Sequence, residues 1–468
     1  MPTIFDPVRF GAVSMDILAC AQANAQALIA RQQSRLSRLL ALAMRDSGFY
    51  RDHLHGVQPG LTALAELPCV SRCELMAHFD DWVTDPQLKL RDLRAFTADA
   101  RRIGEPYLGE YLVWESSGTS HMPGIFIQNA RTMAVYDALE ILRRSAPRPM
   151  QRWLDPLGLA ERVAFVGATS GHFASFVSVQ RLRELHPWLA QSLKSFSLLQ
   201  STRSLVDELN AFAPTVIATY PTVAALLADE AVSGALHFSP KEVWTGGETL
   251  SATVRRRLEL SFGCAVRNSY GASKFMSIAW ECDQHRLHVN ADWVILEPVD
   301  AQGLPMPAEE LSCSTLLTNL ANHVHPLIRY DLGDRVKLQR DPCACGSHLP
   351  VIEVEGRQDD ALVMAGSDGQ PVTLLPLALT TVLEDQAGVF DFHVRQRNDH
   401  TLVLRLPMQG SDGVAAEARC RAALKKFASD QELKPIHVLS ELGQAIPRGR
   451  SGKAKRIVAC RATDSTDR

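Results

Sequence analysis

The stretch YLVWESSGTS at residues 111–120 joins a short apolar run to a hydroxyl-rich loop with one glycine. The apolar run predicts a buried strand. Glycine lets the backbone approach a ligand closely, and the surrounding hydroxyl and N–H groups suit an anion. No Gly-Lys-Ser/Thr follows at the spacing of a Walker P-loop. Alone, the same residues also suit an ordinary Ser/Thr-rich turn.

The chain around this loop repeats the order strand, loop, helix. We expect strands at 111–114, 163–166, 215–219 and 242–245, and helices at 131–144, from Pro221 and from about 251. Such alternation predicts a layered α/β domain with a parallel sheet. Ligands of these sheets bind beyond the carboxyl ends of the strands, where the glycine loops lie.

The two ends of the chain have different patterns. Residues 15–54 predict a helix with Ile29, Leu36, Leu39, Leu40 and Ala43 on one apolar face. Strand-like runs follow the α/β core at 293–299, 314–320, 324–330 and 335–338. A smaller α+β unit with a strand at 401–406 and a helix near 414–429 ends the chain. We therefore expect a large N-terminal domain over 1–357, with a strand-rich subdomain at about 293–355, and a small mobile lid over 358–468.

Composition narrows the class of protein. The 468 residues are 46% hydrophobic and 22% charged, as in globular proteins, and the net charge is −3. That charge argues against nucleic-acid binding and against polybasic attachment to a membrane. The start has no secretory pattern, and the uncharged stretch 163–180 contains hydroxyls and glycines that suit a buried core. We expect a cytoplasmic protein whose ten cysteines form no disulfide scaffold.

Further motifs follow the loop in a fixed order. They are YGAS at 270–273, RYDLGD at 329–334, GRQDD at 356–360 and PRGRSGK at 447–453. This set resembles the core motifs of the adenylate-forming superfamily of acyl-CoA synthetases, adenylation domains and luciferases. It is most similar to the phenylacetate–CoA ligase and coenzyme F390 synthetase branch, whose loop ends in proline without the usual lysine, as at Pro123, and whose members carry Cys-x-Cys-Gly, as at 343–346. The resemblance covers nearly the whole chain.

The resemblance implies a nucleotide site. Its residues are Ser116, Ser117, Gly118, Thr119, Ser120, Gly247, Glu248, Tyr270, Gly271, Ser273, Asp334 and Arg357. The loop hydroxyls would hold the β- and γ-phosphates, and Tyr270 would lie against adenine. Asp334 would accept hydrogen bonds from both ribose hydroxyls, and Arg357 would be a permanent cation near the phosphates. Alternatively, Asp334 is a turn acid and Tyr270 a core residue.

Lys453 matches the lysine that bridges the carboxylate and the α-phosphate as charge builds in the transition state. Because it lies on the terminal unit, that unit must dock over the large domain, and Asp359 matches the hinge. The implied mechanism forms acyl-AMP, rotates the small domain and transfers the acyl group to a thiol. The simpler alternative is that Lys453 belongs to a solvated basic tail.

One position departs from the family pattern. The family has a glutamate that helps to bind Mg²⁺ where this chain has Lys274. Three alternatives stay open: phosphate and water alone hold the metal, Lys274 neutralises the phosphates, or the ATP chemistry is impaired. Glu281 is a weak substitute ligand.

Cysteines and a histidine also predict a structural zinc site. Cys282, His288, Cys343 and Cys345 would make a closed Cys₃His tetrahedron, with His285 as an alternative to His288. The competing interpretation is two buried cysteines and a turn.

The substrates follow from the resemblance. His172, Phe173 and Tyr220 are candidates for the acyl pocket, although His172 also suits a packed histidine. The implied acid is an aryl or arylacetic acid, the cofactors are ATP and Mg²⁺, and the acceptor is the thiol of CoA or of a carrier protein's phosphopantetheine. An amide-forming acyl-AMP ligase and a nucleotide-binding relative without catalysis are the rival functions, and a homodimer is a candidate assembly.

Overall fold

The computed structural model describes residues 4–116, 123–143, 161–355, 361–389, 391–446 and 456–460. Several predicted site residues lie outside these ranges: Ser117, Gly118, Thr119, Ser120, Arg357, Asp359 and Lys453. The domain boundary expected at 357/358 also lies outside them. No helix of the described chain is both long and apolar enough to cross a bilayer.

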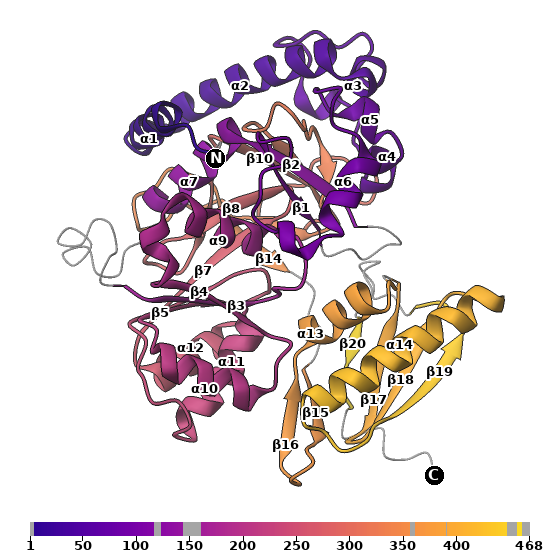
Figure 1. Ribbon diagram of the computed structural model, residues 1–468. Helices are drawn as coiled ribbons and strands as arrows, with labels where there is room; N and C mark the ends of the chain where they lie inside the picture. Colours follow the sequence, from indigo (N-terminus) through magenta and orange to yellow (C-terminus); the bar gives the residue numbers. More distant parts are fainter. Residues whose placement is uncertain are drawn as a thin grey trace.

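Helices form the N-terminal part of the molecule (Figure 1): α1 (Pro7–Ala21), α2 (Ala25–Asp46), α3 (Gly48–His53), α4 (Arg72–Ala77), α5 (Phe79–Trp82) and α6 (Leu90–Thr97). The helical structure expected over 15–54 is confirmed for most of this range, but polar N-caps divide it into three helices. The side chains of Asn24 and Ser47 accept backbone N–H groups and start α2 and α3. Ile29, predicted to be on the apolar face, is exposed, and Leu28 is buried instead.

Among the described residues, a nine-stranded sheet runs in the order β13-β14-β9-β8-β7-β6-β5-β3-β4. Its parallel half consists of β3 (Val163–Gly167), β4 (Leu193–Ser197), β5 (Val216–Thr219), β6 (Glu242–Thr245) and the start of β7 (Ala265–Ala272). The other half is antiparallel, with β8 (Phe275–Glu281), β9 (Leu287–Val289), β13 (Arg335–Leu338) and β14 (Val351–Glu355). The expected parallel sheet is confirmed, with an antiparallel extension.

Helices cover both faces of the parallel half (Figure 1). On one face lie α10 (Thr202–Phe212), α11 (Pro221–Val232) and α12 (Ala252–Phe262), and on the other α7 (Ala130–Arg143) and α9 (Ala174–Leu185). Each helix from α9 to α12 connects two parallel strands, as crossover connections require. This arrangement brings the loops after β3, β5 and β6 to one edge of the sheet.

Smaller sheets complete the large part of the molecule. The hairpin β1 (Tyr111–Glu115) and β2 (Ile125–Asn129) precedes α7, and β10 (Val294–Val299), β11 (Ser314–Asn319) and β12 (Tyr330–Asp331) form a three-stranded sheet. The strand expected over 324–330 is wrong except at Tyr330. Pro326 has no N–H to donate, and the Ile328 and Arg329 amides donate to the Tyr50 and Thr318 hydroxyls instead of to a strand.

The small C-terminal unit is α+β, as predicted. Its elements are β15 (Leu362–Ala365), β16 (Pro371–Leu374), α13 (Pro376–Thr381), a π-helical turn (Val382–Gln386), β17 (His393–Asn398), β18 (Thr401–Leu406), α14 (Gly410–Asp430), β19 (His437–Leu442) and β20 (Ile457–Val458). The Gln431 side-chain amide donates to the Leu199 and Gln200 carbonyl oxygens at 2.8 Å, and the Ser170 hydroxyl donates to Asp385 at 2.7 Å. These contacts hold the unit against the loops after β3 and β4 (Figure 1).

Candidate functional site

Two hydrogen bonds join the described ends of the hydroxyl-rich loop, Ser116 and Gly124. The Ser116 amide donates to the Gly124 carbonyl oxygen at 2.8 Å, and the Gly124 amide donates to the Ser116 hydroxyl at 3.0 Å. Ser116 is buried at the end of β1. A Cβ on Gly124 would lie 3.0 Å from the Phe126 ring, so the strand that leaves the loop is tightly packed. The base of the loop is therefore fixed at the edge of the β1–β2 hairpin.

The glycine pair after β6 lies against Tyr220. Gly247 has a φ of +77°, and an added Cβ would lie 2.9 Å from the Tyr220 ring, so only glycine fits without strain. Glu248 accepts hydrogen bonds at 3.1 Å from both the amide and the hydroxyl of Thr222, in the first turn of α11. A carboxylate at that helix N-terminus is favourable. Burial raises the pKa of Tyr220 to about 12, which keeps its phenol neutral.

Tyr270 and Asp334 meet across 64 residues of sequence. The Tyr270 hydroxyl donates to the Asp334 carboxylate at 2.8 Å. Burial, with the adjacent Asp334 charge, raises the pKa of Tyr270 well above its usual value, so the tyrosine stays a donor. Gly271 forms an irregularity in β7, where an added Cβ would overlap the Met276 carbonyl oxygen at 1.9 Å. The bend and the hydrogen bond together fix the direction of the ring.

Lys274 lies in the turn between β7 and β8, close to the hairpin that carries the loop. Its ammonium is 5.2 Å from the centre of the Phe126 ring and 5.6 Å from that of Tyr330. The preceding carbonyl oxygen, of Ser273, accepts the Trp114 indole N–H at 2.8 Å. The structure therefore brings Lys274 beside Phe126, the same ring that packs on Gly124. A cation therefore lies near Gly124, at the described end of the loop.

His172 is packed in the interior. It is 1% exposed, its Nε2 lies 3.2 Å from the Asp99 carbonyl oxygen, and its ring lies 5.4 Å from that of Phe96. The His172 carbonyl oxygen accepts the Glu115 amide at 2.7 Å, which joins this segment to β1. Phe173 is half-buried at the start of α9. These contacts agree with the packed alternative for His172 and leave its role in acid binding a prediction.

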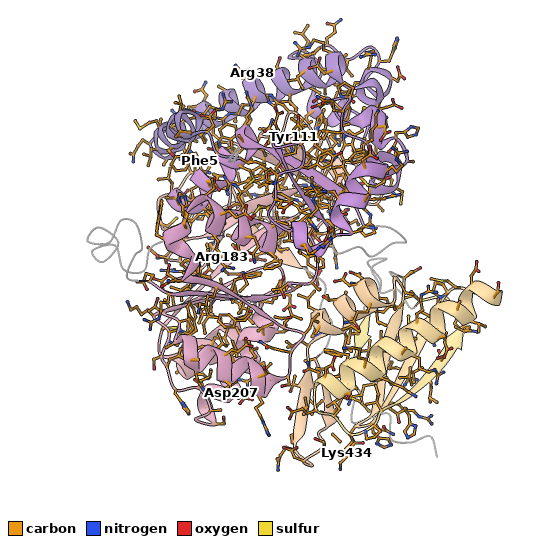
Figure 2. All side chains as sticks on the ribbon, viewed as in Figure 1. Phe5, Arg38, Tyr111, Arg183, Asp207 and Lys434 are labelled. Carbon is orange, nitrogen blue, oxygen red and sulfur yellow. The ribbon has the colours of Figure 1, made fainter. Side chains whose placement is uncertain are left out.

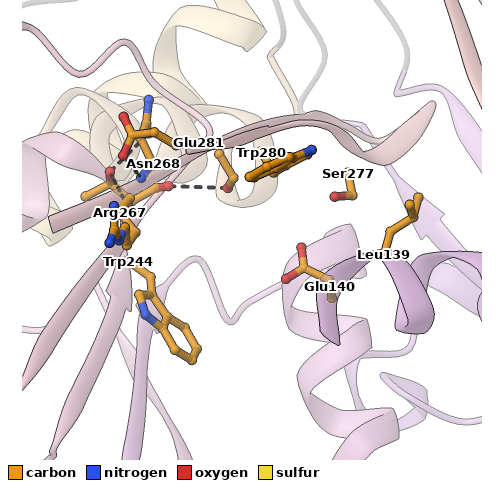
Figure 3. Close-up of a pocket in the computed structure, with 10 residues that line it drawn as sticks. Leu139, Glu140, Trp244, Arg267, Asn268, Ser277, Trp280 and Glu281 are labelled. Carbon is orange, nitrogen blue, oxygen red and sulfur yellow. Dashed lines mark hydrogen bonds between the residues drawn. The ribbon is translucent and has the colours of Figure 1, made fainter. Parts of the chain in front are cut away.

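The Glu281 carboxylate already has two partners in the structure. It accepts the Asn268 amide at 3.0 Å and forms an ion pair with Arg255. It lines a small cavity of about 20 Å³ between the sheet and α7, with Trp244, Trp280 and others (Figure 3). The cavity is lined by residues of β6, β7, β8 and α7 that form no sequence motif, so only Glu281 among them was a candidate from the sequence.

The four predicted zinc ligands come together. The ligand atoms of Cys282, His288, Cys343 and Cys345 all lie within 4.8 Å of one another. The two sulfur atoms of Cys282 and Cys343 are 3.7 Å apart, and the Cys345 sulfur is 3.3 Å from His288 Nε2. His288 Nδ1 lies 3.0 Å from the Leu349 carbonyl oxygen, a contact that leaves Nε2 free for a metal.

These distances fit a tetrahedral metal. Zinc bound by two thiolates separates their sulfur atoms by about 3.8 Å, close to the distance between Cys282 and Cys343. Burial lowers the pKa of His288, which favours the neutral ring that a metal requires. The alternative His285 lies 3.8 Å from the Glu281 carboxylate.

Comparison with known proteins shows which fold the chain has. No protein-family model matches the chain. The structure of 2-hydroxyisobutyryl-CoA ligase in complex with 2-HIB-AMP and CoA is similar over 95% of this chain and 91% of that one, with a TM-score of 0.57 and 21% identity. An open conformation of that ligase covers 91% and 90%, with a TM-score of 0.51 and 21% identity.

The chain therefore has the fold of the adenylate-forming acyl-CoA ligases, as the sequence resemblance predicted. Among curated proteins, CapK of Staphylococcus aureus is 27% identical over 146 residues. That match spans 30% of this chain and 30% of CapK, less than a third of the relative's length.

Proposed function

We propose that this protein is an AMP-forming ligase that activates a carboxylic acid with ATP and passes the acyl group to a thiol. The observation that carries the proposal is the 2.8 Å hydrogen bond between Tyr270 and Asp334. The hydrogen-bonded ends of the hydroxyl-rich loop, Ser116 and Gly124, support it. In this fold, the pair presents an aromatic face and a carboxylate at the carboxyl ends of the parallel strands. These groups suit adenine and the ribose hydroxyls.

The two half-reactions divide the work among the residues. An oxygen of the substrate carboxylate attacks the α-phosphorus of ATP, and the bond to pyrophosphate breaks. Ser116 to Ser120 would hold the departing phosphates, Lys453 would neutralise the charge that builds on the α-phosphate, and Arg357 would face the ribose and phosphates. The thiol sulfur, after losing its proton, then attacks the acyl carbon, and AMP leaves.

Lys274 would take part in charge neutralisation. Its ammonium lies beside Phe126, whose ring packs on Gly124 at the end of the loop. We infer that it acts on the phosphates from the β7–β8 turn. A bound Mg²⁺ would supply further charge neutralisation and would need no carboxylate at this position. The ion pair between Glu281 and Arg255 weighs against Glu281 as a metal ligand.

The acid is proposed to be an aryl or arylacetic acid, bound near Phe173 and Tyr220. Tyr220 lines the approach to Gly247, and its neutral phenol suits an uncharged acyl group. Because the solved relative is a 2-hydroxyisobutyryl-CoA ligase, a small branched hydroxy acid belongs in the same test panel.

The test is ATP-dependent release of pyrophosphate with aryl, arylacetic and short aliphatic acids, followed by thioester detection with CoA or a carrier protein. ATP binding without turnover on any acid would favour the nucleotide-binding relative, and amide formation in place of a thioester would favour the amide ligase. The acceptor that supports turnover identifies the thiol partner.

We also propose that Cys282, His288, Cys343 and Cys345 hold a structural zinc. The support is the closed set of four ligand atoms within 4.8 Å and the contact of His288 with Leu349. With four protein ligands, no position is left for a substrate, so the metal would stabilise the junction of β8, β9 and β14. Metal analysis of protein purified without added zinc tests this, and absence of stoichiometric zinc contradicts it.

A further inference from the structure

A second, larger cavity lies among the N-terminal helices. It measures about 190 Å³ and is bounded by α1, α2, the start of α7 and the loop after β11. Arginine side chains from three helices line it: Arg9, Arg35, Arg38 and Arg131. Asp16 is the acidic residue among its lining groups. Taken together, the lining side chains carry a clear positive excess.

The single carboxylate of this cavity is already shared. Asp16 forms ion pairs with both Arg31 and Arg35. Within the described chain, no ion pair reaches Arg9, Arg38 or Arg131, and the Nε atoms of Arg9 and Arg131 are buried without a hydrogen-bond partner. Buried donors of this kind normally find a partner in a folded protein or its ligand. The cavity therefore presents three guanidinium groups with no ion-pair partner within the described chain.

Trp293 adds a further hydrogen-bond donor to the cavity. Trp293 lines it, is 7% exposed and has a buried indole N–H without a partner among the described residues. The Arg35 guanidinium lies over the Trp293 ring at 3.6 Å, which fixes the direction of that arginine. An oriented guanidinium loses less side-chain entropy when it binds a ligand.

The charges around the cavity repel one another. Arg9 lies in the first turn of α1 and Arg131 in the first turn of α7, and a cation is unfavourable at a helix N-terminus. Burial, with the neighbouring arginines, lowers the pKa of Arg131 to about 10. Burial and then Arg131, Arg38 and Arg9 lower the pKa of His323 to about 4, so this ring adds a neutral hydrogen-bonding group. A bound anion would offset this mutual repulsion.

We propose that this cavity is a binding site for a phosphate group, separate from the nucleotide site. Guanidinium forks match the oxygens of phosphate with paired, charge-assisted hydrogen bonds, and the unpaired arginines exceed what one carboxylate can neutralise. The proposal does not depend on the ligase activity.

The position of the cavity separates it from the nucleotide loop. Gly124 lies before β2 and Arg131 lies after it. The five residues of β2 span about 17 Å and separate the two positions. Figure 2 places Arg38 at the end of the molecule opposite Lys434 of the C-terminal unit. A ligand here would contact neither Asp334 nor the C-terminal unit.

The experiment is titration of the full chain with inorganic phosphate, followed by calorimetry and thermal unfolding. We expect the Arg9→Gln/Arg38→Gln double variant to bind phosphate about 100-fold more weakly, since each charged hydrogen bond contributes about tenfold. Saturating phosphate should raise the wild-type Tm by roughly 2–4 °C, and the double variant should lose this shift. Arg45→Gln, on the same helix as Arg38 but outside the cavity, is the matched control and should behave as wild type.

Two further arms separate this cavity from other sites. Thr119→Ala weakens the nucleotide loop and should leave the phosphate titration of the cavity intact, whereas loss of binding there would assign the phosphate to the loop. Citrate tests for a carboxylate ligand, and tighter binding of citrate than of phosphate overturns the assignment. Equal phosphate binding by wild type and the double variant also overturns it. A change of oligomeric state in the double variant, without phosphate binding by wild type, would show an acidic contact between copies instead.

Discussion

The Cys–His cluster and the proposed nucleotide site are assembled in different ways. The cluster joins the adjacent antiparallel strands β8, β9 and β14, and all its ligand atoms meet within the described chain. The proposed nucleotide site would collect Ser116, Glu248, Tyr270 and Asp334 from separate loops and strands, and it would need Lys453 from the C-terminal part of the sequence.

The difference in assembly indicates whether each site affects stability or turnover. A centre closed within one sheet can act on stability without any motion. A site divided between two units depends on how those units meet, so its residues act on turnover more than on folding. Substitutions at the two places should therefore change different measurements.

The largest expected effect belongs to Lys453→Ala. Removing a cation that faces developing charge should lower the rate of pyrophosphate release about 10²- to 10³-fold, with little change in ATP affinity or Tm. Lys455→Ala, two residues further along the same basic segment, is the control and should stay near wild type. Survival of adenylation in Lys453→Ala would remove this lysine from the mechanism and leave the site confined to the large domain.

Cys345→Ser should have the opposite signature. Loss of one ligand should release zinc and lower the free energy of unfolding by about 3 kcal/mol, a fall of roughly 3–5 °C in Tm for a chain of this size. Adenylation per folded molecule should change little. Metal content and thermal unfolding are the measurements, and Cys313→Ser, an exposed cysteine outside the cluster, is the control. Full zinc content and an unchanged Tm in Cys345→Ser would contradict the closed centre.

Asp334→Asn tests the nucleotide half of the comparison. The neutral amide weakens two hydrogen bonds to ribose, so the KM for ATP should rise about 10- to 100-fold while zinc content stays unchanged. Asp341→Asn, exposed in the same strand-rich region, is the control. If KM is unchanged and only Tm falls, Asp334 serves to orient Tyr270 and is a positioning residue of the sheet.

The same comparison separates what the sequence can predict from what it cannot. Cys282 and His288 are close in sequence, and Cys-x-Cys at 343–345 is a compact turn, so ligand chemistry alone indicates the cluster. The periodic strands and the helix that starts at Pro221 also follow from local pattern. Tyr270 and Asp334, in contrast, carry no local signal of their contact, and only the family resemblance joined them.

Other features depend on tertiary contacts that no motif marks. The helical stretch expected over 15–54 is divided into α1, α2 and α3, because the Asn24 and Ser47 side chains cap the starts of α2 and α3. The irregular backbone before Tyr330 exists because its amides find the Tyr50 and Thr318 hydroxyls. The arginine-lined cavity draws single residues from three helices, so its charge is invisible until the helices pack together.

The smallest expected effect concerns the contact between the two units. The Ser170 hydroxyl donates to Asp385 at 2.7 Å, from the loop that also carries His172 and Phe173. Ser170→Ala removes one hydrogen bond, worth about 0.5–1.5 kcal/mol, and so favours other arrangements of the units. The half-reaction that uses the present arrangement should slow about 2- to 10-fold and the other should not, as measured by single-turnover adenylation and thioester formation.

Arg203→Gln provides the matched comparison for this contact. Arg203 and Asp368 also join the two units, but they lie 3.9 Å apart and their side chains are 71% and 55% exposed. Such a pair is screened by solvent, so its loss should change neither half-reaction measurably. If Ser170→Ala slows both half-reactions equally, the contact supports the fold of the loop, and the division between stability and turnover does not extend to the interface.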